Sequence, residues 1–285
     1  MASAKEIRGQ IKAIQNTAKI TKAMEMVAAS KMRKAEENVV ASRAYAEGIA
    51  RVIANLMQAH PEYRHPFIVP RESVRRVGLI MISTDKGLCG PLNTNSFKAT
   101  LALIKGKDLP FEAYTVGRRA GMFMRRISGD VKGLAENIPD SPELKDILGV
   151  VTLAMERYLA GEIDELHLVF NQFVNTLTQT PTTVQLLPCP DPAEIKHPGY
   201  WDYIYEPDSR EVLDQLMRRY IESLVFHGVL ENKACEQSAR MVAMKSATDN
   251  AKEIVNDLRI TYNKARQAAI TQELAEICAG ASAAQ

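Results

Sequence analysis

The sequence has few aromatic residues, no long hydrophobic run and no proline in either of its ends. Phe, Trp and Tyr make up 6% of the 285 residues, and all 13 prolines fall between Pro61 and Pro207. A proline inside a helix removes a hydrogen bond and clashes with the preceding turn, at a cost of about 3 kcal/mol. Both ends of the chain are therefore free to form long helices, whereas the middle holds the turns.

The overall composition excludes several classes of protein. Hydrophobic residues account for 46% of the chain and charged residues for 25%, which excludes a disordered or collagen-like chain. No segment approaches the roughly 20 apolar residues that a membrane-spanning helix needs, so we expect any membrane association to run through partners. Lys5, Glu6 and Arg8 stand where a secretory signal needs apolar residues, which favours a bacterial cytoplasmic location.

The residue types of common active sites are present but widely scattered. The four cysteines, the five histidines and Asp85 show no spacing typical of a metal site, a disulfide scaffold or an acid–base pair. The sequence also lacks the GxxxxGKS, GxxxxGKT and GxGxxG phosphate-binding patterns. It therefore predicts reduced thiols, no metal ion, no cofactor and no catalytic residue.

Charge is unevenly distributed along the chain, although its net value is only +2. Residues 1–57 hold ten basic and five acidic residues, residues 58–208 hold 16 and 19, and residues 209–285 hold ten of each. A basic arm suits a nucleic acid, a membrane surface or an acidic protein, and charge alone does not choose among them. Tyr45 is the only aromatic residue of this arm, which disfavours nucleic acid because single-stranded bases stack on aromatic side chains.

A seven-residue repeat runs through the first arm, over residues 7–56. Of the fifteen positions reached by alternate steps of four and three, twelve are apolar and four are alanine. The positions are Ile7, Ile11, Ile14, Ala18, Thr21, Glu25, Ala28, Met32, Ala35, Val39, Ser42, Ala46, Ile49, Ile53 and Leu56. A strict heptad repeat indicates a left-handed coiled coil, and small residues let the partner helix approach closely. Met24, Met26 and Val27 lie off this seam, which predicts a second contact surface.

The last arm carries a similar repeat downstream of a broader apolar face. The repeat comprises Ala247, Ala251, Ile254, Leu258, Thr261, Ala265, Ala268, Gln272 and Ala275. The broader face comprises Leu213, Leu216, Met217, Tyr220, Ile221, Leu224 and Val225, and it is typical of a helix packed on a domain. Two arms that flank a compact insert can pair within one chain only in antiparallel orientation. We therefore expect an antiparallel hairpin and no homo-oligomer.

The middle of the chain alternates strand and helix patterns. Strands are expected over residues 74–83, 111–116, 165–173 and 182–187. Helices are expected over residues 95–105, 117–126 and 141–161, the last with Ser141 as its N-cap. Such alternation predicts an open, mostly parallel, Rossmann-like α/β sheet. The expected organisation is an N-terminal coiled-coil helix at 1–58, an α/β domain at 74–195 and a C-terminal coiled-coil helix at 208–280.

Gly87 and Gly90 follow the first expected strand, where a phosphate-binding loop would lie. Lys86 precedes both glycines, whereas the lysine of the common phosphate-binding loop follows its glycines. The sequence therefore favours a plain turn between strand and helix over a phosphate site.

Three long motifs resemble one known family. They are NTAKITKAMEMVAASKMRKA at residues 16–35, STDKGLCGPLN at residues 83–93 and YNKARQAAITQELAEI at residues 262–277. Shorter matches, EIRGQI, WDYIYEPD and ARMVAMKSATDNA, extend the similarity over nearly the whole length. The chain resembles the gamma subunit of the rotary F-type ATP synthase of bacteria.

The resemblance implies a central rotor shaft. Its coiled coil would enter a hexamer of alternating alpha and beta subunits, while its α/β domain would lie near the membrane and hold the epsilon subunit. Rotation would couple proton movement through the membrane c-ring to ATP synthesis or hydrolysis on the beta subunits, so the chain itself would not be an enzyme. It would be a peripheral protein on the cytoplasmic face of the bacterial inner membrane.

The resemblance also implies roles for three groups of residues. Met24 and the basic residues around it, Lys19, Lys22, Lys31 and Arg33, would face an acidic lever segment of beta. Arg266, Gln267, Thr271 and Glu273 would form a polar catch that hydrogen-bonds to beta. Tyr203, Tyr205 and Glu206 would form the foot that meets the membrane ring. Charged side chains on any exposed helix are the alternative interpretation of the first two groups.

A second function stays open from the residues alone. A coiled-coil adaptor with a small-ligand-binding α/β domain would also combine long arms with a compact insert. It needs a polar constellation in the middle of the chain, which the sequence does not show.

Overall fold

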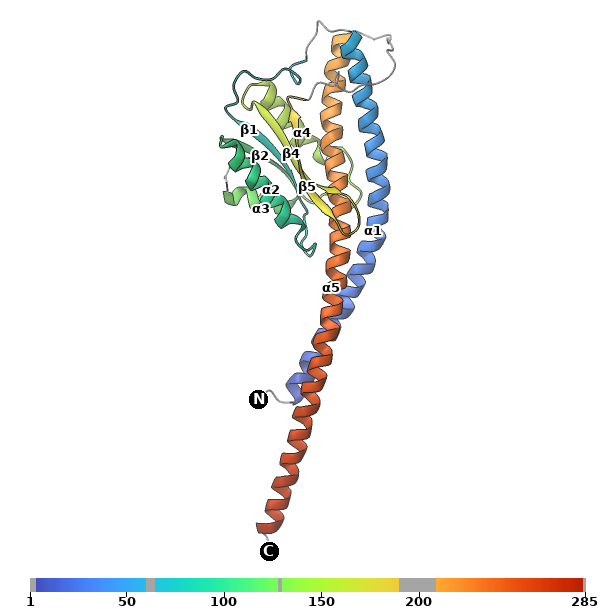
Figure 1. The fold of residues 1–285 in the computed structure, drawn as a ribbon, viewed down its shortest axis with the longest axis vertical. Coiled ribbons are helices and arrows are strands. Elements are labelled where there is room, and N and C mark those ends of the chain that lie inside the picture. Colours follow the sequence, from blue (N-terminus) through green and yellow to red (C-terminus); the bar gives the residue numbers. More distant parts are fainter. Residues whose placement is uncertain (1–3, 60–64, 128–129, 190–208, 284–285) are drawn as a thin grey trace. The chain divides into compact units, whose positions relative to one another are not determined.

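The computed structural model describes residues 4–59, 65–127, 130–189 and 209–283 (Figure 1). In chain order its elements are α1 (Ala4–Ala59), β1 (Val77–Ile82), α2 (Leu92–Lys107), β2 (Phe111–Val116), α3 (Arg118–Ile127), β3 (Val131–Ala135), α4 (Lys145–Leu159), β4 (Glu165–Phe173), β5 (Gln179–Leu187) and α5 (Ser209–Ala283). The chain divides into two compact units, residues 29–239 and residues 1–28 with 240–285. Helices α1 and α5 contribute to both units.

The two terminal helices are as long as the distribution of proline allows. Helix α1 has 56 residues and α5 has 75, and neither contains a proline. At a rise of 1.5 Å per residue, their contour lengths are about 84 and 112 Å. The prediction of two long terminal helices is confirmed.

The strands form one five-stranded sheet in the order β3-β2-β1-β4-β5. Strands β1 to β4 run parallel to one another, and only β5 runs antiparallel, against β4. This arrangement confirms the expected open, mostly parallel sheet. The chain extends the sheet first on one side of β1 and then on the other, so the strand order reverses between β1 and β4. In such sheets, the crevice at the carboxyl ends of these two strands is the usual ligand site.

Two local expectations differ from the structure. Strand β3 is absent from the sequence-based prediction, because its five residues are mostly half-buried and show neither a hydrophobic run nor strict alternation. The expected N-cap at Ser141 is wrong, because α4 begins only at Lys145. Asp146, in the first turn of α4, instead accepts the N–H of Glu143, two residues before the helix, at 2.8 Å.

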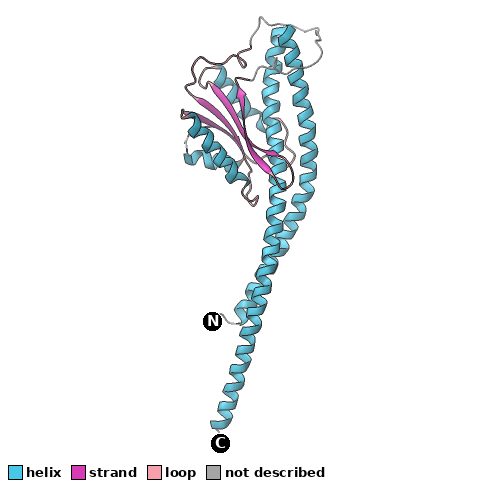
Figure 2. Ribbon diagram, in the orientation of Figure 1, coloured by secondary structure: helices cyan, strands magenta, loops and turns pink. Residues whose placement is uncertain are grey.

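Helices cover both faces of the sheet and give three layers (Figure 2). All six residues of β1 are buried, as a central parallel strand requires. Ile80 and Ile82 belong to the core shared with α4 and α5, whereas Leu79 and Met81 belong to the core shared with α2 and α3. The two apolar clusters therefore follow the alternation of side chains along β1.

The first part of α5 packs directly on the sheet. Leu213, Met217, Ile221 and Val225 are buried in the same core as β1 and β4, which confirms the broad apolar face predicted for this part of the helix. At Gly228, where that face ends, the backbone of α5 comes close to the strands. A Cβ atom there would lie 3.1 Å from Ile82 Cδ1 and 3.3 Å from Leu168 Cδ2. The glycine thus allows the helix to lie against the strands.

Within residues 29–239, α1 and α5 pair side by side in antiparallel orientation. Ala35 and Val39 of α1 pack with Ala234 and Leu230 of α5. Further along α1, the Ser42 Oγ lies 2.7 Å from Nδ1 of His227. Residues later in α1 therefore face residues earlier in α5, as in an antiparallel pair. Every expected seam position of α1 up to Ile53 is buried or half-buried, which confirms the phase of the first repeat.

The helix pair of the other unit is slender and has small residues in its seam. Thr21 and Thr248 approach within 2.7 Å through their hydroxyl oxygens. The buried positions of α5 here are Met244, Thr248, Ala251 and Val255. The expected phase is therefore wrong at Ile254, which is 47% exposed while Val255 is 6% exposed. The expected and observed seams share Ala251, and they differ in whether the next seam position is Ile254 or Val255.

The paired seam ends before the end of α5. All residues from 266 to 279 are exposed, so Ala268, Gln272 and Ala275, expected in the seam, do not lie in one among the described residues. The reason is the length of α1. Because Thr21 faces Thr248 in an antiparallel pair, Ala4 at the start of α1 reaches only about residue 265.

The phase of the α5 seam can be tested with two adjacent substitutions. We expect Val255→Ala to lower the free energy of unfolding by about 1–2 kcal/mol, because it removes two buried methyl groups. Ile254→Ala, at the exposed neighbouring position, should lower it by less than about 0.5 kcal/mol. Urea unfolding of the full chain, followed by circular dichroism, measures both. A larger effect at Ile254 than at Val255 would contradict the seam.

Candidate functional site

Helix α5 is buried on all sides over residues 228–239, which we call the buried segment. A helix on the surface of a domain normally buries one stripe and exposes the rest. Half of this twelve-residue segment is polar or charged, namely Glu231, Asn232, Lys233, Glu236, Gln237 and Ser238. A buried polar group without a partner costs free energy, so the partners of these side chains explain the segment.

Glu231 joins three elements. Its carboxylate accepts the backbone N–H of Phe173 at the end of β4 at 2.6 Å and the Arg43 guanidinium of α1 at 3.1 Å. It also lies 3.3 Å from Nε2 of His227 on its own helix. Burial by itself would raise the pKa of this carboxyl, but the hydrogen bonds from His227 and Phe173 outweigh burial and hold the pKa below its usual value. Glu231 is therefore a buried anion at neutral pH.

Asn232 and Ser238 bind the strand β4 and the turn that follows it. Asn232 Oδ1 accepts a hydrogen bond from Asn171 Nδ2 at 2.8 Å, and Asn171 Oδ1 in turn accepts one from Ser96 of α2 at 2.8 Å. Ser238 Oγ donates to the carbonyl of Thr176 at 2.5 Å. These bonds attach α5 to the carboxyl end of a central strand.

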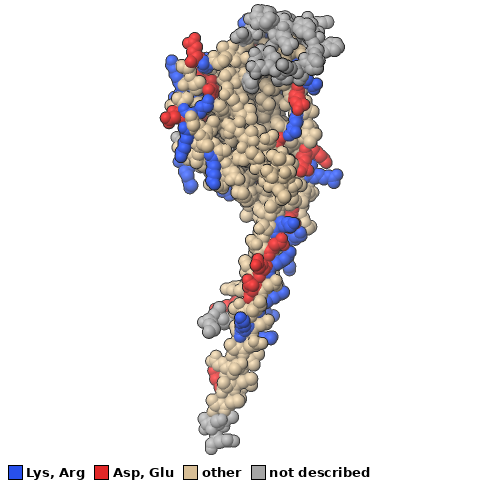
Figure 3. Space-filling model, in the orientation of Figure 1, with Lys and Arg blue, Asp and Glu red and all other residues tan. Residues whose placement is uncertain are grey.

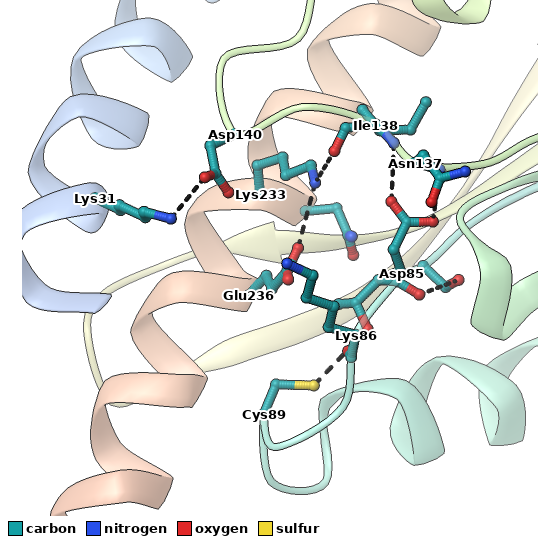
Figure 4. A network of polar contacts seen from close by, with 12 residues as sticks. Lys31, Asp85, Lys86, Cys89, Asn137, Ile138, Asp140, Lys233 and Glu236 are labelled. Atoms are coloured by element: carbon teal, nitrogen blue, oxygen red, sulfur yellow. Dashed lines mark hydrogen bonds and ion pairs between the residues drawn. The ribbon is translucent and has the colours of Figure 1, made fainter. Parts of the chain in front are cut away.

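Lys233 binds the segment that follows β3 (Figure 4). Its ammonium donates to the carbonyl of Ile138 at 2.9 Å and lies 3.6 Å from Glu236 Oε2. The N–H of Ile138 donates to Asp85 Oδ2 at 2.9 Å. The other carboxylate oxygen, Oδ1 of Asp85, accepts the N–H groups of Arg118 at 2.9 Å and Asn137 at 3.1 Å. Asp85 thus fixes the backbone around Ile138, and the carbonyl of Ile138 binds Lys233.

The loop STDKGLCGPLN packs on α5 at the place where related folds bind ligands. Cys89 and Leu92 form an apolar cluster with Cys235 and Ala239 of α5, beside Phe173. This cluster lies at the carboxyl edge of β1 and β4, so α5 covers that edge of the sheet. The loop therefore helps to hold α5 against the sheet.

We call the groups around the buried segment the collar. The collar consists of Ile138, Asn171, Phe173, Thr176 and Arg43, with Asp85 behind Ile138. The sequence did not predict the collar. Three consecutive polar residues on a helix are typical of a solvent-facing stretch, and this describes Glu231, Asn232 and Lys233. Their partners come from distant parts of the chain, so no local pattern predicts them.

A Ser–His–Glu arrangement occurs where α1 meets α5. Ser42 Oγ lies 2.7 Å from His227 Nδ1, and His227 Nε2 lies 3.3 Å from Glu231. The residue types match a hydrolytic triad, yet Ser42 and His227 both lie inside helices, whose backbone N–H groups are bonded within the helix and cannot form an oxyanion hole. The arrangement therefore serves as a contact between helices.

The cysteines and the other candidate ligands give no metal site among the described residues. No group of three or more His, Cys, Asp or Glu side chains is placed to hold a metal ion there. The described cysteines form no disulfide, and Cys89, Cys189 and Cys235 are buried. Burial raises the pKa of the Cys189 thiol to about 12, which keeps it protonated and unreactive.

None of the described helices is long and apolar enough to span a bilayer.

A cleft of about 840 Å³ lies at the amino ends of the strands, opposite to the carboxyl ends that α5 covers. Four arginines line it, but Arg76 and Arg157 bind the buried carboxylate of Glu112 at 3.0 and 2.7 Å, and Arg71 donates to the carbonyl of Tyr158 at 2.9 Å. Acidic residues also line the cleft. Two of its four arginines thus neutralise a buried acid.

Of the residues expected to face the acidic lever, the four basic ones are exposed on α1. Lys19 and Lys22 are exposed, and Lys22 pairs with Glu25 at 2.9 Å. Met24 is half-buried, whereas its neighbours Met26 and Val27 are 61% and 52% exposed, as expected for residues off the seam.

Lys31 and Arg33 lie on the part of α1 that belongs to residues 29–239. Lys31 binds Asp140 at 2.6 Å, close to the collar, and this hydrogen bond lowers the pKa of Asp140. The Arg33 guanidinium lies 3.8 Å from Glu37 and is largely exposed. Of the two, Arg33 has the more accessible charge.

The expected catch residues lie on the unpaired end of α5. Arg266, Gln267, Thr271 and Glu273 are all exposed. The same end exposes an apolar stripe of Ile270, Leu274 and Ile277 and carries few charges (Figure 3). The expected foot residues Tyr203, Tyr205 and Glu206 lie outside the described residues.

Comparisons with known proteins identify the family. The family model for ATP synthase matches residues 3–284. The chain is 52% identical to the ATP synthase gamma chain of Nitrosococcus oceani and 51% identical to that of Thiobacillus denitrificans, each over 99% of this chain and 100% of the relative. The chain therefore belongs to the family of ATP synthase gamma chains.

Solved structures show the same fold. The rotor of the Euglena gracilis mitochondrial ATP synthase matches with a TM-score of 0.66 at 19% identity, over 94% of this chain and 98% of the other. The central stalk and c-ring of the Tetrahymena thermophila mitochondrial ATP synthase match with a TM-score of 0.63 at 24% identity, over 80% of this chain and 99% of the other. The sheet with two long terminal helices is therefore a known architecture.

The charge of Glu231 makes stability depend on pH. Because its native pKa is lowered, its contribution is present above the ordinary value of 4.5 and is lost as the pH falls through the native pKa. We expect Glu231→Gln to be about 3 kcal/mol less stable than the wild type at pH 7. The difference should shrink below about pH 4.5.

Urea unfolding of the full chain at several pH values tests this dependence. Glu253→Gln, on an exposed part of the same helix, is the matched control and should follow the wild type at every pH. A stability difference between Glu231→Gln and the wild type that stays constant on acidification would contradict the assigned charge.

Proposed function

We propose that the chain is the rotating central shaft of an F-type ATP synthase. Its rotation couples proton flow through a membrane ring to ATP synthesis or hydrolysis on the beta subunits. The observation that carries the proposal is the end of α5, where residues 266–279 continue as a single exposed helix with an apolar stripe. A helix of this kind is stable only when other surfaces surround it. The full-length similarity to gamma chains supports a hexamer of alpha and beta subunits as that surface.

In this function the chain acts mechanically, and catalysis belongs to the beta subunits. Turning an asymmetric shaft inside a ring of three catalytic subunits would present each with a different surface in turn, so their affinities for nucleotide would change in sequence. The polar side chains that the structure brings together support a mechanical role, because they hold helices to the sheet.

Lys19, Lys22, Met24, Lys31 and Arg33 would meet an acidic lever segment of beta. Exposed cations favour such a contact by charge, and the exposed Met26 and Val27 beside them add apolar surface. Lys31 has a second role within the chain, because it pairs with Asp140. Lys22 and Arg33 are therefore the better probes of the lever contact.

Arg266, Gln267, Thr271 and Glu273 would form a catch that holds a rotational state through hydrogen bonds to beta. Their exposure on α5 leaves their side chains accessible to a partner. Tyr203, Tyr205 and Glu206 would meet the c-ring, and the α/β domain would hold epsilon. These contacts would make the chain a peripheral protein on the cytoplasmic face of the bacterial inner membrane.

Purification of the tagged chain tests the shaft function. We expect it to bring down an ATPase hexamer with one shaft for every three beta subunits. Removal of residues 266–285 should reduce the recovery of beta, because the exposed end of α5 would be the part surrounded by the hexamer. Recovery of the chain without any alpha or beta subunit, or tight ATP binding by the chain alone, would contradict the proposal.

The lever contact can be tested by charge reversal. We expect Lys22→Glu combined with Arg33→Glu to lower proton-driven ATP synthesis about tenfold, because two exposed cations would become anions facing an acidic partner. The intramolecular pairs with Glu25 and Glu37 are exposed and contribute at most about 0.5 kcal/mol, so the chain should still fold.

Synthesis by inverted membrane vesicles that carry the complex measures this effect. Lys98→Glu, an exposed reversal on α2, is the control and should leave synthesis unchanged. Full synthesis by the double variant would refute the lever assignment.

A further inference from the structure

We propose that the collar is the joint that transmits torque between the α/β domain and helix α5. This inference rests on the proposed shaft function and adds to it the residues that carry the load inside the rotor. It concerns contacts within residues 29–239 only.

The contacts hold α5 from several directions. Successive residues of an α-helix project about 100° apart around its axis. Glu231, Asn232 and Lys233 are consecutive, and each binds a different backbone segment or side chain of the domain. Their partners are Phe173, Asn171 and Ile138. A helix held in three directions resists rotation about its own axis.

The chemistry of the contacts makes slippage costly. Apolar packing fixes the position of a helix only through the shapes of the side chains, because the hydrophobic effect itself has no direction. Hydrogen bonds to buried charges do have direction. If α5 turned by one residue within the collar, Glu231 would leave the Phe173 N–H and Lys233 would leave the Ile138 carbonyl. The pairs with His227 and Glu236 lie within α5 and would persist, but both charges would lose their hydrogen bonds to the domain. The Phe173 N–H and the Ile138 carbonyl would also lose these partners, and burying polar groups without hydrogen bonds is costly.

The collar is anchored in rigid parts of the domain. Phe173 and Asn171 belong to β4, a strand with neighbours on both sides. Ile138 is held by Asp85, which also binds the first residue of α3 through the Arg118 N–H. A force on Lys233 would therefore pass into the sheet through β1, β3 and α3.

Helix α1 joins the same joint. Arg43 of α1 binds Glu231 at 3.1 Å. Lys31 of α1 binds Asp140, two residues after Ile138, at 2.6 Å (Figure 4). The Lys31 pair is largely exposed and contributes little, whereas the Glu231 carboxylate is fully buried. Torque on the domain would thus reach both helices, mainly through Glu231 and Lys233.

The test separates hydrolysis from coupling in the assembled complex. Lys233→Met and Glu231→Gln keep the approximate volume of each side chain and remove its charge. Lys98→Met, on an exposed part of α2, is the matched control. ATP hydrolysis is measured in the soluble assembly of hexamer and chain. Proton-driven ATP synthesis is measured in vesicles that contain the complete complex, and both rates are expressed per assembled complex.

We expect hydrolysis by both variants to stay within about twofold of the wild type, because turning the shaft from the hexamer side does not require the joint. Synthesis should fall about tenfold, as expected when a buried hydrogen bond to a charge is lost. Lys233→Arg, which keeps the charge, should recover most of the synthesis. The control should change neither rate.

Each other outcome decides against the joint or against the function. A synthesis-to-hydrolysis ratio equal to that of the wild type in both variants would overturn the joint. If neither variant assembles, the segment serves folding alone and the torque assignment falls. If the wild-type chain itself supports neither assembly nor synthesis, the proposed shaft function fails instead, so the two failures are distinguishable.

Discussion

Burying charge in the middle of a helix is the constraint on which the rest of this structure depends. Glu231 and Lys233 lie two residues apart on α5 and are both buried. A buried charge is tolerated only with partners of good geometry, and these partners come from β4, from the segment after β3 and from α1. These contacts favour one register of the helix relative to the domain. Asp85 supports it by binding the N–H of Ile138, whose carbonyl accepts the Lys233 ammonium.

Helix α5 meets different surroundings along its length, and each stretch of sequence fits one of them. The stretch around Met217 and Val225 is apolar and packs on the sheet, and Gly228 permits the closest approach. The polar buried segment follows. Small seam residues such as Ala251 then suit a slender pair with α1, and residues 266–279 are exposed as a single helix. One continuous helix thus combines an anchored part with an accessible end, which fits a rotor shaft.

Much of the fold could be predicted from the sequence, because it depends on local patterns. Missing prolines predicted the long helices, the heptad repeat gave the correct seam of α1, and apolar runs marked β1, β2 and β4. The short strand β3 and the choice between Ile254 and Val255 depend on neighbours that no local pattern specifies. The collar was not predicted because Glu231 and Lys233 look like solvent-facing residues, and only Phe173 and Ile138, far away in the chain, explain their burial.

The most direct test of the joint is mechanical. A bead fixed to the α/β domain of a single complex reports the load at which ATP-driven rotation of that domain stalls, while nucleotide turnover shows whether the hexamer still works. For Lys233→Met, we expect the bead to stall at a clearly lower load than for the wild type or Lys98→Met, with turnover continuing because α5 slips inside the collar. The same stall load in all three would contradict the account.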